Sequence, residues 1–306
     1  MLRRRIKTLP AALIATAVIA IILLEIFRAG TGKTFTEFES GAAYNSDSDI
    51  TLNEKRPASL FLPTNYSKDT PVPLLINLHG YTGKSSVHSS YTYLQVAAKD
   101  RGLAYIAPDG IEDSLRNQFW NASTACCNFN NVAVDDVAYL KSLIDEASSL
   151  VSIDPKRIYL FGHSNGHFMS YKFACSTKGV VAAVAGLAGA MENNIDDCTK
   201  SPTNTLHIHG TNDQTILYNG GALFQKKYPS VDQTLAQWAE INSCNDTSEV
   251  DFDLMQSMLG QETTKRIFTC SKADLELWRI NGGIHTPTLD KDFANKVLDW
   301  LVARTL

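Results

Sequence analysis

A serine flanked by two glycines, where an apolar run meets a helix-compatible run, constrains this chain most. Residues 157–171 read Arg-Ile-Tyr-Leu-Phe-Gly-His-Ser-Asn-Gly-His-Phe-Met-Ser-Tyr. The pattern predicts a strand, a sharp turn at 162–166 and then a helix. A turn this tight leaves no room for side chains at Gly162 and Gly166. It lifts the Ser164 hydroxyl above the sheet, beside a helix N-terminus that favours a developing anion.

The chain order of acid and histidine tests whether this serine is a nucleophile. A serine hydroxyl needs a base to take its proton, and the base needs an orienting partner. After such a turn, the acid and then the histidine follow at the ends of later strands. Beyond residue 209 one histidine remains, His285, and it lies in a glycine-rich loop. Asp213 lies just after the apolar run 205–209, in a Gly-Thr-Asn-Asp loop. We therefore predict Ser164 as nucleophile, Asp213 as orienting acid and His285 as base, converging beyond the carboxyl ends of the strands.

Two backbone N–H groups are expected to hold the oxyanion that forms on a substrate. The turn itself supplies the Asn165 amide. The second donor belongs to the turn after an early apolar strand at 72–78, where Tyr81 is our first choice and Thr82 the second. His79, in the same turn, is interpreted as a buried structural histidine.

Other polar residues have structural interpretations that we prefer over sites. His163 and His167 lie four residues apart, but the glutamate of a zinc-protease helix is missing. His207 and His209 alternate on one strand and face one side. No carboxylate cluster accompanies them, so core histidines are favoured over a metal pair. Asp136 is interpreted as a residue that starts a helix and braces a loop, and no metal site is predicted.

Apolar runs alternate with helical periodicity along the chain, which predicts a mostly parallel sheet with helices on both faces. The predicted strands are 58–62, 72–78, 103–107, 158–161, 180–187, 205–209, 266–270 and 275–280. The predicted helices are 89–99, 134–150, one that ends near 175, 231–242 and 293–302. The segment 30–34 looks like part of a phosphate-binding loop, but it lacks the first glycine and a preceding strand, so no nucleotide site is expected.

The first 29 residues differ from the rest of the chain. Four basic residues within the first seven precede an apolar run at 9–24, as in an export signal or a membrane anchor. The run barely reaches the length of about 20 residues that a bilayer needs. We interpret 1–29 as a signal peptide or, preferably, an N-terminal membrane anchor, 30–45 as a linker and 46–306 as the catalytic domain. The domain would then be extracellular, periplasmic or on the cell surface.

Charge and cysteine usage narrow the class of protein further. The net charge of −4 over 306 residues gives no support for binding nucleic acid. The six cysteines form no C-x-x-C pair, which favours disulfides in an exported protein over a zinc site. We expect Cys244 to pair with Cys270, and Cys175 and Cys198 are a candidate pair. Adjacent Cys126 and Cys127 stay open between a vicinal bridge and separate partners.

Seven short motifs lie between residues 58 and 287. They are Leu78-His79-Gly80, Pro108-Asp109-Gly110, Trp120-Asn121-Ala122, Cys126-Cys127, Val134-Asp135-Asp136-Val137, the serine turn and His209-Gly210-Thr211-Asn212-Asp213. Together they resemble the polyhydroxybutyrate depolymerase and feruloyl esterase family of extracellular α/β-hydrolases. The resemblance implies an α/β-hydrolase fold, hydrolysis of carboxylic esters by the three predicted residues, and no metal or organic cofactor. Two departures, His167 for a usual glycine and Thr286 for a usual tryptophan, affect the substrate pocket.

The resemblance implies a serine esterase that acts on a small or oligomeric ester. Trp120 and Tyr218 are predicted to line its substrate pocket. Polymer-degrading members carry a separate binding domain after a linker, and we see none here. Soluble esters, such as hydroxybutyrate oligomers or acetylated and feruloylated sugars, are therefore the expected substrates. The alternatives are a serine peptidase and a non-enzymatic hydrolase-like ectodomain; the first usually adds a propeller or lid domain, and the second usually loses triad members.

Overall fold

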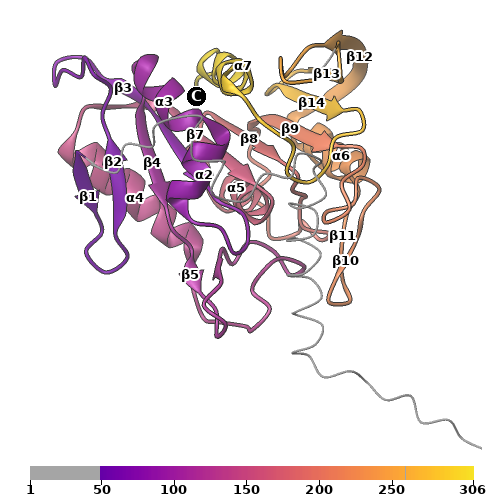
Figure 1. Cartoon of the computed structure of the whole chain (residues 1–306), viewed down its shortest axis with the longest axis horizontal. Coiled ribbons are helices and arrows are strands. Elements are labelled where there is room, and N and C mark those ends of the chain that lie inside the picture. The colour runs from indigo at the N-terminus through magenta and orange to yellow at the C-terminus, as the bar shows by residue number, and fades with distance from the viewer. Residues whose placement is uncertain (1–48, 259) are drawn as a thin grey trace, which may run out of the picture. The chain divides into compact units, whose positions relative to one another are not determined.

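A ten-stranded sheet runs through the part of the chain that the computed structural model describes, residues 49–258 and 260–306 (Figure 1). Its strand order is β1-β2-β4-β3-β7-β8-β9-β14-β13-β12. These strands are β1 (Ile50–Leu52), β2 (Ala58–Phe61), β3 (Val72–Leu78), β4 (Ala104–Pro108), β7 (Ile153–His163), β8 (Ala183–Leu187), β9 (Asn204–Gly210), β12 (Cys244–Phe252), β13 (Thr263–Cys270) and β14 (Leu275–Ile280). Two small hairpins are separate from it, β5 (Ile111–Glu112) with β6 (Gln118–Phe119), and β10 (Gly221–Leu223) with β11 (Lys226–Tyr228).

The six middle strands of the sheet are parallel. They run from β4 through β3, β7, β8 and β9 to β14. The outer pairs on each side are antiparallel, with β1 and β2 on one side and β13 and β12 on the other. This arrangement confirms the predicted mostly parallel sheet, and it places the carboxyl ends of six strands along one edge.

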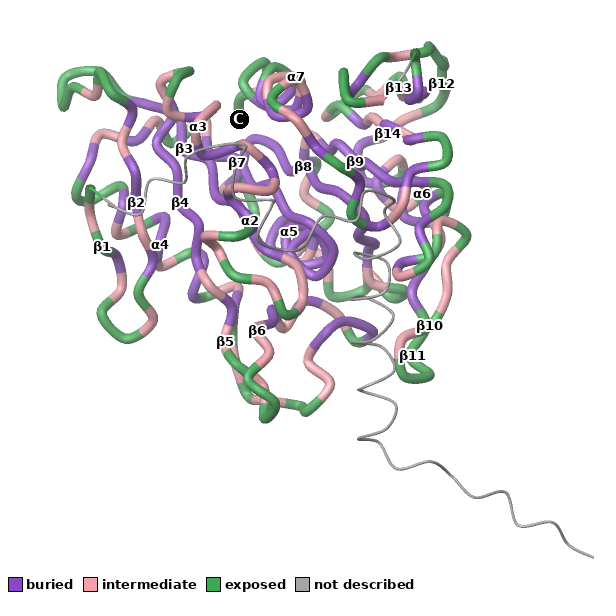
Figure 2. Tube along the Cα trace, viewed as in Figure 1, coloured by how far each residue is buried: buried purple, intermediate pink, exposed green. Residues whose placement is uncertain are grey.

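Helices cover both faces of the sheet (Figure 1). They are α2 (Ser85–Thr92), α3 (Leu94–Asp100), α4 (Asp136–Leu150), α5 (Asn165–Ser176), α6 (Val231–Asn242) and α7 (Lys291–Val302). Successive side chains of a strand point to opposite faces. In β3, Leu74 and Ile76 join a core cluster with α4, α5 and α6, whereas Leu75 joins a second cluster with α3 and α7. The central strands are therefore buried on both sides, as Figure 2 shows in purple.

Most predicted elements are confirmed, one predicted helix differs, and several strands were not predicted. The predicted helix 89–99 is two helices, because Tyr93 adopts a left-handed conformation (φ 57°) between α2 and α3. The short strands β5, β6, β10 and β11 and the nine-residue strand β12 were not predicted. We take β12 as the example. All nine of its residues are exposed or only partly buried, so it carries no apolar alternation, and its pairing with β13 defines it instead.

The predicted N-terminal segment 1–29 and linker 30–45, which includes the segment 30–34 that resembles a phosphate-binding loop, lie outside the described residues. Within 49–258 and 260–306, none of the helices combines the length and apolar character needed to cross a bilayer.

All six cysteines of the sequence form disulfides. Cys244–Cys270 and Cys175–Cys198 confirm the expected pairs, and Cys126 bonds its neighbour Cys127. The Cys244–Cys270 bond joins directly opposed residues of β12 and β13. It therefore ties the exposed edge strand to the rest of the sheet.

Replacing Cys244 and Cys270 together by serine should lower the free energy of unfolding by about 3–4 kcal/mol. The bond closes a loop with a sequence separation of 26, so its loss gives the unfolded chain more freedom. Urea unfolding of the wild type and the double variant measures the difference, and mapping of unreduced peptides verifies the bond. Equal stabilities would show that the bond does not constrain the unfolded state.

Candidate active site

The turn between β7 and α5 holds Ser164 in a strained conformation. Ser164 has φ 54° and ψ −121°, a backbone geometry that residues with side chains rarely adopt. A Cβ at Gly162 would lie 2.2 Å from the Gly166 carbonyl oxygen. One at Gly166 would lie 2.1 Å from the Leu78 carbonyl oxygen. Both glycines are therefore required by close backbone contacts, as the sequence predicts.

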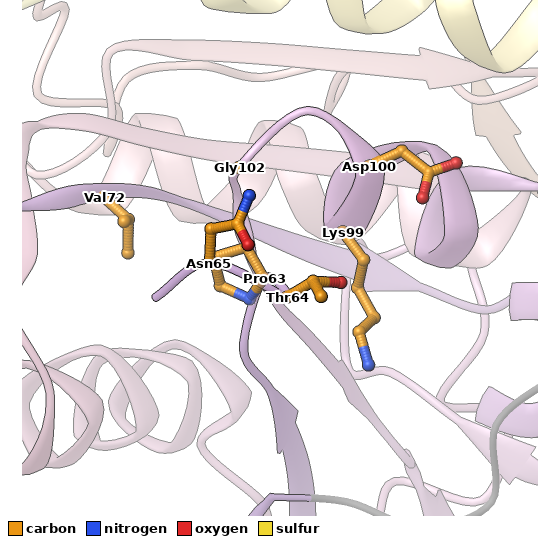
Figure 3. Close-up of a pocket in the computed structure, with 7 residues that line it drawn as sticks. All are labelled: Pro63, Thr64, Asn65, Val72, Lys99, Asp100 and Gly102. Atoms are coloured by element: carbon orange, nitrogen blue, oxygen red, sulfur yellow. The ribbon is translucent and has the colours of Figure 1, made fainter. Parts of the chain in front are cut away.

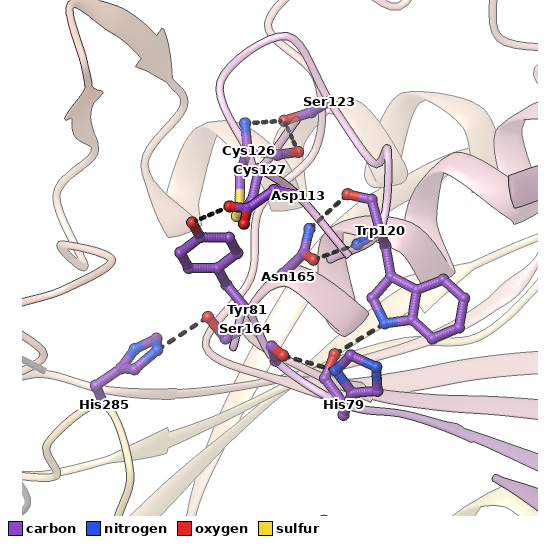
Figure 4. The surroundings of a disulfide bond; sticks show 11 residues. His79, Tyr81, Asp113, Trp120, Ser123, Cys126, Cys127, Ser164, Asn165 and His285 are labelled. Carbon is purple, nitrogen blue, oxygen red and sulfur yellow. Dashed lines mark hydrogen bonds between the residues drawn. A yellow bond between two sulfur atoms is a disulfide. The ribbon is translucent and has the colours of Figure 1, made fainter. Parts of the chain in front are cut away.

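The three residues predicted to act together lie in hydrogen-bonding contact. Ser164 Oγ is 3.0 Å from His285 Nε2, and His285 Nδ1 is 2.8 Å from Asp213 Oδ2 (Figure 4 shows the Ser164–His285 pair). They follow β7, β14 and β9 respectively, so all three lie at the carboxyl edge of the parallel strands. All three residues are buried.

Four hydrogen-bond donors surround the Asp213 carboxylate. Its Oδ1 accepts from the amides of Thr215 and Ile216, at 2.8 and 2.9 Å. Its Oδ2 faces His285 Nδ1 and also His209 Nε2, which is 3.2 Å away. Burial by itself would raise the pKa of this carboxyl, but attraction to His285 and the bond from His209 hold the pKa well below its usual range. Asp213 therefore stays ionised at neutral pH.

The backbone N–H groups of the two turns around Ser164 differ in whether they are hydrogen-bonded. In the described part of the chain, the amides of Tyr81 and Asn165 donate to no protein acceptor. The Thr82 amide, our second choice, donates to the Gln118 carbonyl at 2.9 Å and is engaged. The turn that carries Tyr81 packs on the nucleophile, since a Cβ at Gly80 would lie 3.3 Å from the Ser164 Cβ.

Trp120 is a correction, because it belongs to the core rather than to a pocket wall. Its side chain is 0% exposed, and its indole Nε1 donates to the His79 carbonyl at 3.0 Å. Its backbone N–H and C=O also bond the Asn165 side chain, at 2.7 and 3.0 Å. Trp120 therefore connects the two turns that carry the free amides (Figure 4). The loop pattern around it could not distinguish this buried brace from an exposed ring.

Tyr218, the other predicted pocket residue, is half-buried. Its ring lies edge-on to the His209 ring, with centroids 5.7 Å apart. His209 in turn contacts Asp213. Tyr218 is thus one residue removed from the acid, and its contact with substrate stays a prediction.

His79 and Asp136 brace loops, in line with our interpretation of both. His79 Nδ1 is 2.7 Å from the Gly80 carbonyl, and its Nε2 accepts from the Gly110 amide at 2.8 Å. Burial lowers the pKa of His79, so the ring is neutral. Asp136 pairs with Arg56 at 2.6 Å and accepts from the Asn121 amide at 2.7 Å. Both residues hold the loop that carries Trp120.

The structure adds a residue that the sequence reasoning missed, His163 inside the serine turn. Its Nε2 donates to the His285 carbonyl at 2.9 Å and so supports the loop that carries the predicted base. Burial lowers the pKa of His163 to about 3, aided by repulsion from His285. A histidine at the second position of a G-x-S-x-G turn gives no sequence signal for this contact.

Among residues 49–258 and 260–306, no group of histidine, cysteine and carboxylate side chains is arranged to hold a metal ion.

A pocket elsewhere in the fold is separate from these residues. It has a volume of about 220 Å³ and is lined by Lys99, Asp100 and Gly102, which precede β4, and by Val72 at the start of β3 (Figure 3). These residues lie at the amino ends of the parallel strands. Ser164 follows a carboxyl end, so the pocket is not part of the candidate active site.

A mostly parallel sheet with a Ser–His–Asp array at its carboxyl edge defines an α/β-hydrolase fold. Residues 64–259 match the family described as Phospholipase/Carboxylesterase, and the chain belongs to that family. The acetyl xylan esterase from Aspergillus awamori shares this fold, with a TM-score of 0.58 and 14% identity over 80% of this chain and 93% of that one.

Curated relatives include named esterases. Feruloyl esterase B of Piromyces equi is 32% identical over 60% of this chain and 34% of its own length. The bifunctional acetylxylan esterase/xylanase XynS20E of Neocallimastix patriciarum is 26% identical over 56% of this chain and 24% of its own. A probable feruloyl esterase C of Aspergillus niger is 28% identical over 56% and 60%. The chain thus spans less than two thirds of each of these relatives.

Proposed function

We propose that this chain is a serine esterase that hydrolyses carboxylic esters through an acyl-enzyme. The observation that carries the proposal is the continuous contact from Ser164 Oγ to His285 (3.0 Å) and on to Asp213 (2.8 Å). A serine with a positioned base and an ionised orienting acid is the arrangement that acyl transfer requires. Membership of the phospholipase/carboxylesterase family supports the same reaction class.

The proposed reaction begins when Ser164 Oγ attacks the ester carbonyl while His285 Nε2 takes the hydroxyl proton. Asp213 accepts the Nδ1–H of His285, which sets the tautomer and stabilises the imidazolium. His285 then protonates the leaving alcohol, and an acyl group remains on Ser164. Water repeats the sequence and releases the acid. No step requires a metal ion or an organic cofactor.

The free amides of Tyr81 and Asn165 are the proposed oxyanion hole. Each donor contributes on the order of 3 kcal/mol to stabilising the transition state in comparable sites. Asn165 is the first residue of α5, so the positive end of the helix dipole adds to the effect. Trp120 keeps both turns in register through its bonds to His79 and Asn165.

The proposed substrates are soluble esters with small acyl groups or small aromatic acyl groups. The names of the relatives, feruloyl esterase and acetylxylan esterase, support acetylated and feruloylated sugars. Hydroxybutyrate oligomers, which the sequence resemblance also implies, stay within the proposal. Tyr218 is proposed as a wall of the substrate site. Three disulfides support an exported protein.

A substrate scan tests the reaction class. We expect hydrolysis of p-nitrophenyl butyrate, methyl ferulate and acetylated xylo-oligosaccharides, with kcat/KM on peptide anilides lower by at least about 100-fold because an amide has a poorer leaving group. A phosphonate that mimics the tetrahedral intermediate should label Ser164, as peptide mass spectrometry can show. Faster cleavage of anilides would replace the proposal by a serine peptidase. Absence of both activities and of labelling would favour a non-enzymatic ectodomain.

A further inference from the structure

A line of buried hydrogen bonds leads from helix α5 to the carboxylate of Asp213. The Tyr171 hydroxyl is 2.8 Å from His207 Nδ1, and His207 Nε2 is 3.1 Å from His209 Nδ1. His209 Nε2 is 2.8 Å from the Ile216 carbonyl and 3.2 Å from Asp213 Oδ2. Every side chain in this line is buried, with exposures of 0 to 4%.

The Ile216 carbonyl fixes one hydrogen at the end of the line, and the other bonds can follow from it. A carbonyl oxygen only accepts, so His209 Nε2 carries a hydrogen and donates to Ile216 and Asp213. With one hydrogen on the His209 ring, at Nε2, its Nδ1 accepts and His207 donates from Nε2. His207 accepts in turn at Nδ1 from the Tyr171 hydroxyl. All donors therefore point towards the carboxylate.

Packing keeps this line in one arrangement. His207 and His209 face the same side of β9, as their alternation predicts, with ring planes 17° apart and centroids 5.3 Å apart. The Tyr171 ring stacks on His207 at an interplanar angle of 12°. Burial is the main cause that lowers the pKa of His207 well below its usual value, and repulsion from the neighbouring histidines lowers it further. The ring stays neutral, as the direction of the bonds requires.

We propose that His209 is a positioning residue for Asp213, held in its tautomer by His207 and Tyr171. The inference rests on the proposed function, since it assigns Asp213 to the triad. The N–H of His209 lies between two acceptors, the Ile216 carbonyl and the carboxylate that holds His285. Without that N–H the two oxygens face each other unbridged and repel. Asp213 Oδ2 would then move away from the position in which it orients His285.

Two substitutions of His209 separate positioning from simple packing. His209→Leu removes the donor, and we expect kcat to fall by about 10-fold to 100-fold with KM within about twofold, because a bond to a charged group is lost while the substrate site is unchanged. His209→Gln places an amide N–H near the same position. We expect it to recover kcat to within about fivefold of the wild type.

A third variant acts at the far end of the line. Tyr171→Phe leaves His207 Nδ1 without its donor, so His207 can take the other tautomer and stop donating to His209. We expect kcat to fall about threefold to tenfold with KM unchanged. Tyr159→Phe is the matched control. Its hydroxyl donates to the Arg304 carbonyl at 2.9 Å, and its ring belongs to the core cluster that includes α3 and α7, on the other face of the sheet from α5. That control should keep the wild-type kcat.

The outcomes decide the inference separately from the proposed function. Soluble His209→Leu with wild-type kcat, or His209→Gln no better than His209→Leu, would overturn it. Should His209→Leu fail to fold, an effect of Tyr171→Phe equal to that of Tyr159→Phe would overturn it instead. Phosphonate titration of Ser164 counts active sites in each variant. Loss of activity in Ser164→Ala with no effect at His209 refutes only the inference, whereas full activity in Ser164→Ala refutes the proposed function.

Discussion

Replacing Ser164 with alanine is expected to lower kcat for ester hydrolysis by roughly a millionfold. The substitution removes the proposed nucleophile, and no other hydroxyl in the described chain is known to contact His285 Nε2. The folded structure should persist, because the Ser164 side chain caps no helix and makes its contact with the base alone. Near-ultraviolet circular dichroism and kcat on p-nitrophenyl butyrate measure the two properties.

A control in α5 tests whether the effect of Ser164→Ala comes from the Ser164 hydroxyl or from the loss of any buried serine hydroxyl nearby. Ser170 is buried in α5, and its hydroxyl donates to the Gly166 carbonyl at 3.0 Å. Ser170→Ala should retain kcat to within about threefold, since it loses a bond within one helix.

His285→Ala should lower kcat nearly as much as Ser164→Ala, and Asp213→Asn should lower it somewhat less, by about 10⁴-fold. Substantial hydrolysis by purified Ser164→Ala would contradict the triad.

Mild acid is expected to destabilise the protein strongly, because its histidines are buried. All seven histidines of the sequence are buried in the structure. Burial lowers the pKa of five of them, His79, His88, His163, His167 and His207, and brings His163 to about 3. These rings stay neutral in the folded chain at a pH where exposed histidines are charged.

The sign of the effect follows from proton uptake. An unfolded histidine binds a proton below a pKa of about 6.5, whereas these folded ones do not, so the unfolded state holds more protons. Their contribution to stability is therefore complete above about pH 6.5 and is lost as the pH falls towards their folded pKa values. A histidine that stays neutral in the folded chain at about pH 5.5 costs roughly 1 kcal/mol there, so the five together should lower the free energy of unfolding by several kcal/mol.

Urea unfolding at about pH 7.5, 6.5 and 5.5 measures this loss. These pH values lie around the pKa of about 6.5 of a histidine in the unfolded chain. A matched variant is His88→Gln. In the wild type, His88 Nε2 lies 2.9 Å from the side-chain oxygen of Asn77, and His88 is not part of the triad. It should reduce the dependence on pH by about one proton, or about 1.4 kcal/mol per pH unit. Equal stabilities at the three pH values would contradict the prediction.

Local pattern and chain order were sufficient for much of the fold and for the core of the candidate site. The strands 72–78 and 275–280 and the helix 231–242 coincide with β3, β14 and α6, because each is a continuous buried run or a clear 3.6-residue period. The contact of Ser164, His285 and Asp213 could be anticipated because the strand-end positions of an α/β sheet meet at one edge.

Contacts between distant segments decided the rest. Trp120 is a brace rather than a pocket wall because the Asn165 side chain and the His79 carbonyl meet its polar atoms, and neither is near it in sequence. The exposed β12 exists through its pairing with β13 and not through its own composition. His207 and His209 were predicted only to share a face. That Tyr171 approaches from α5 and Asp213 from the next loop depends on how helix and sheet pack, which residue spacing along one strand does not specify.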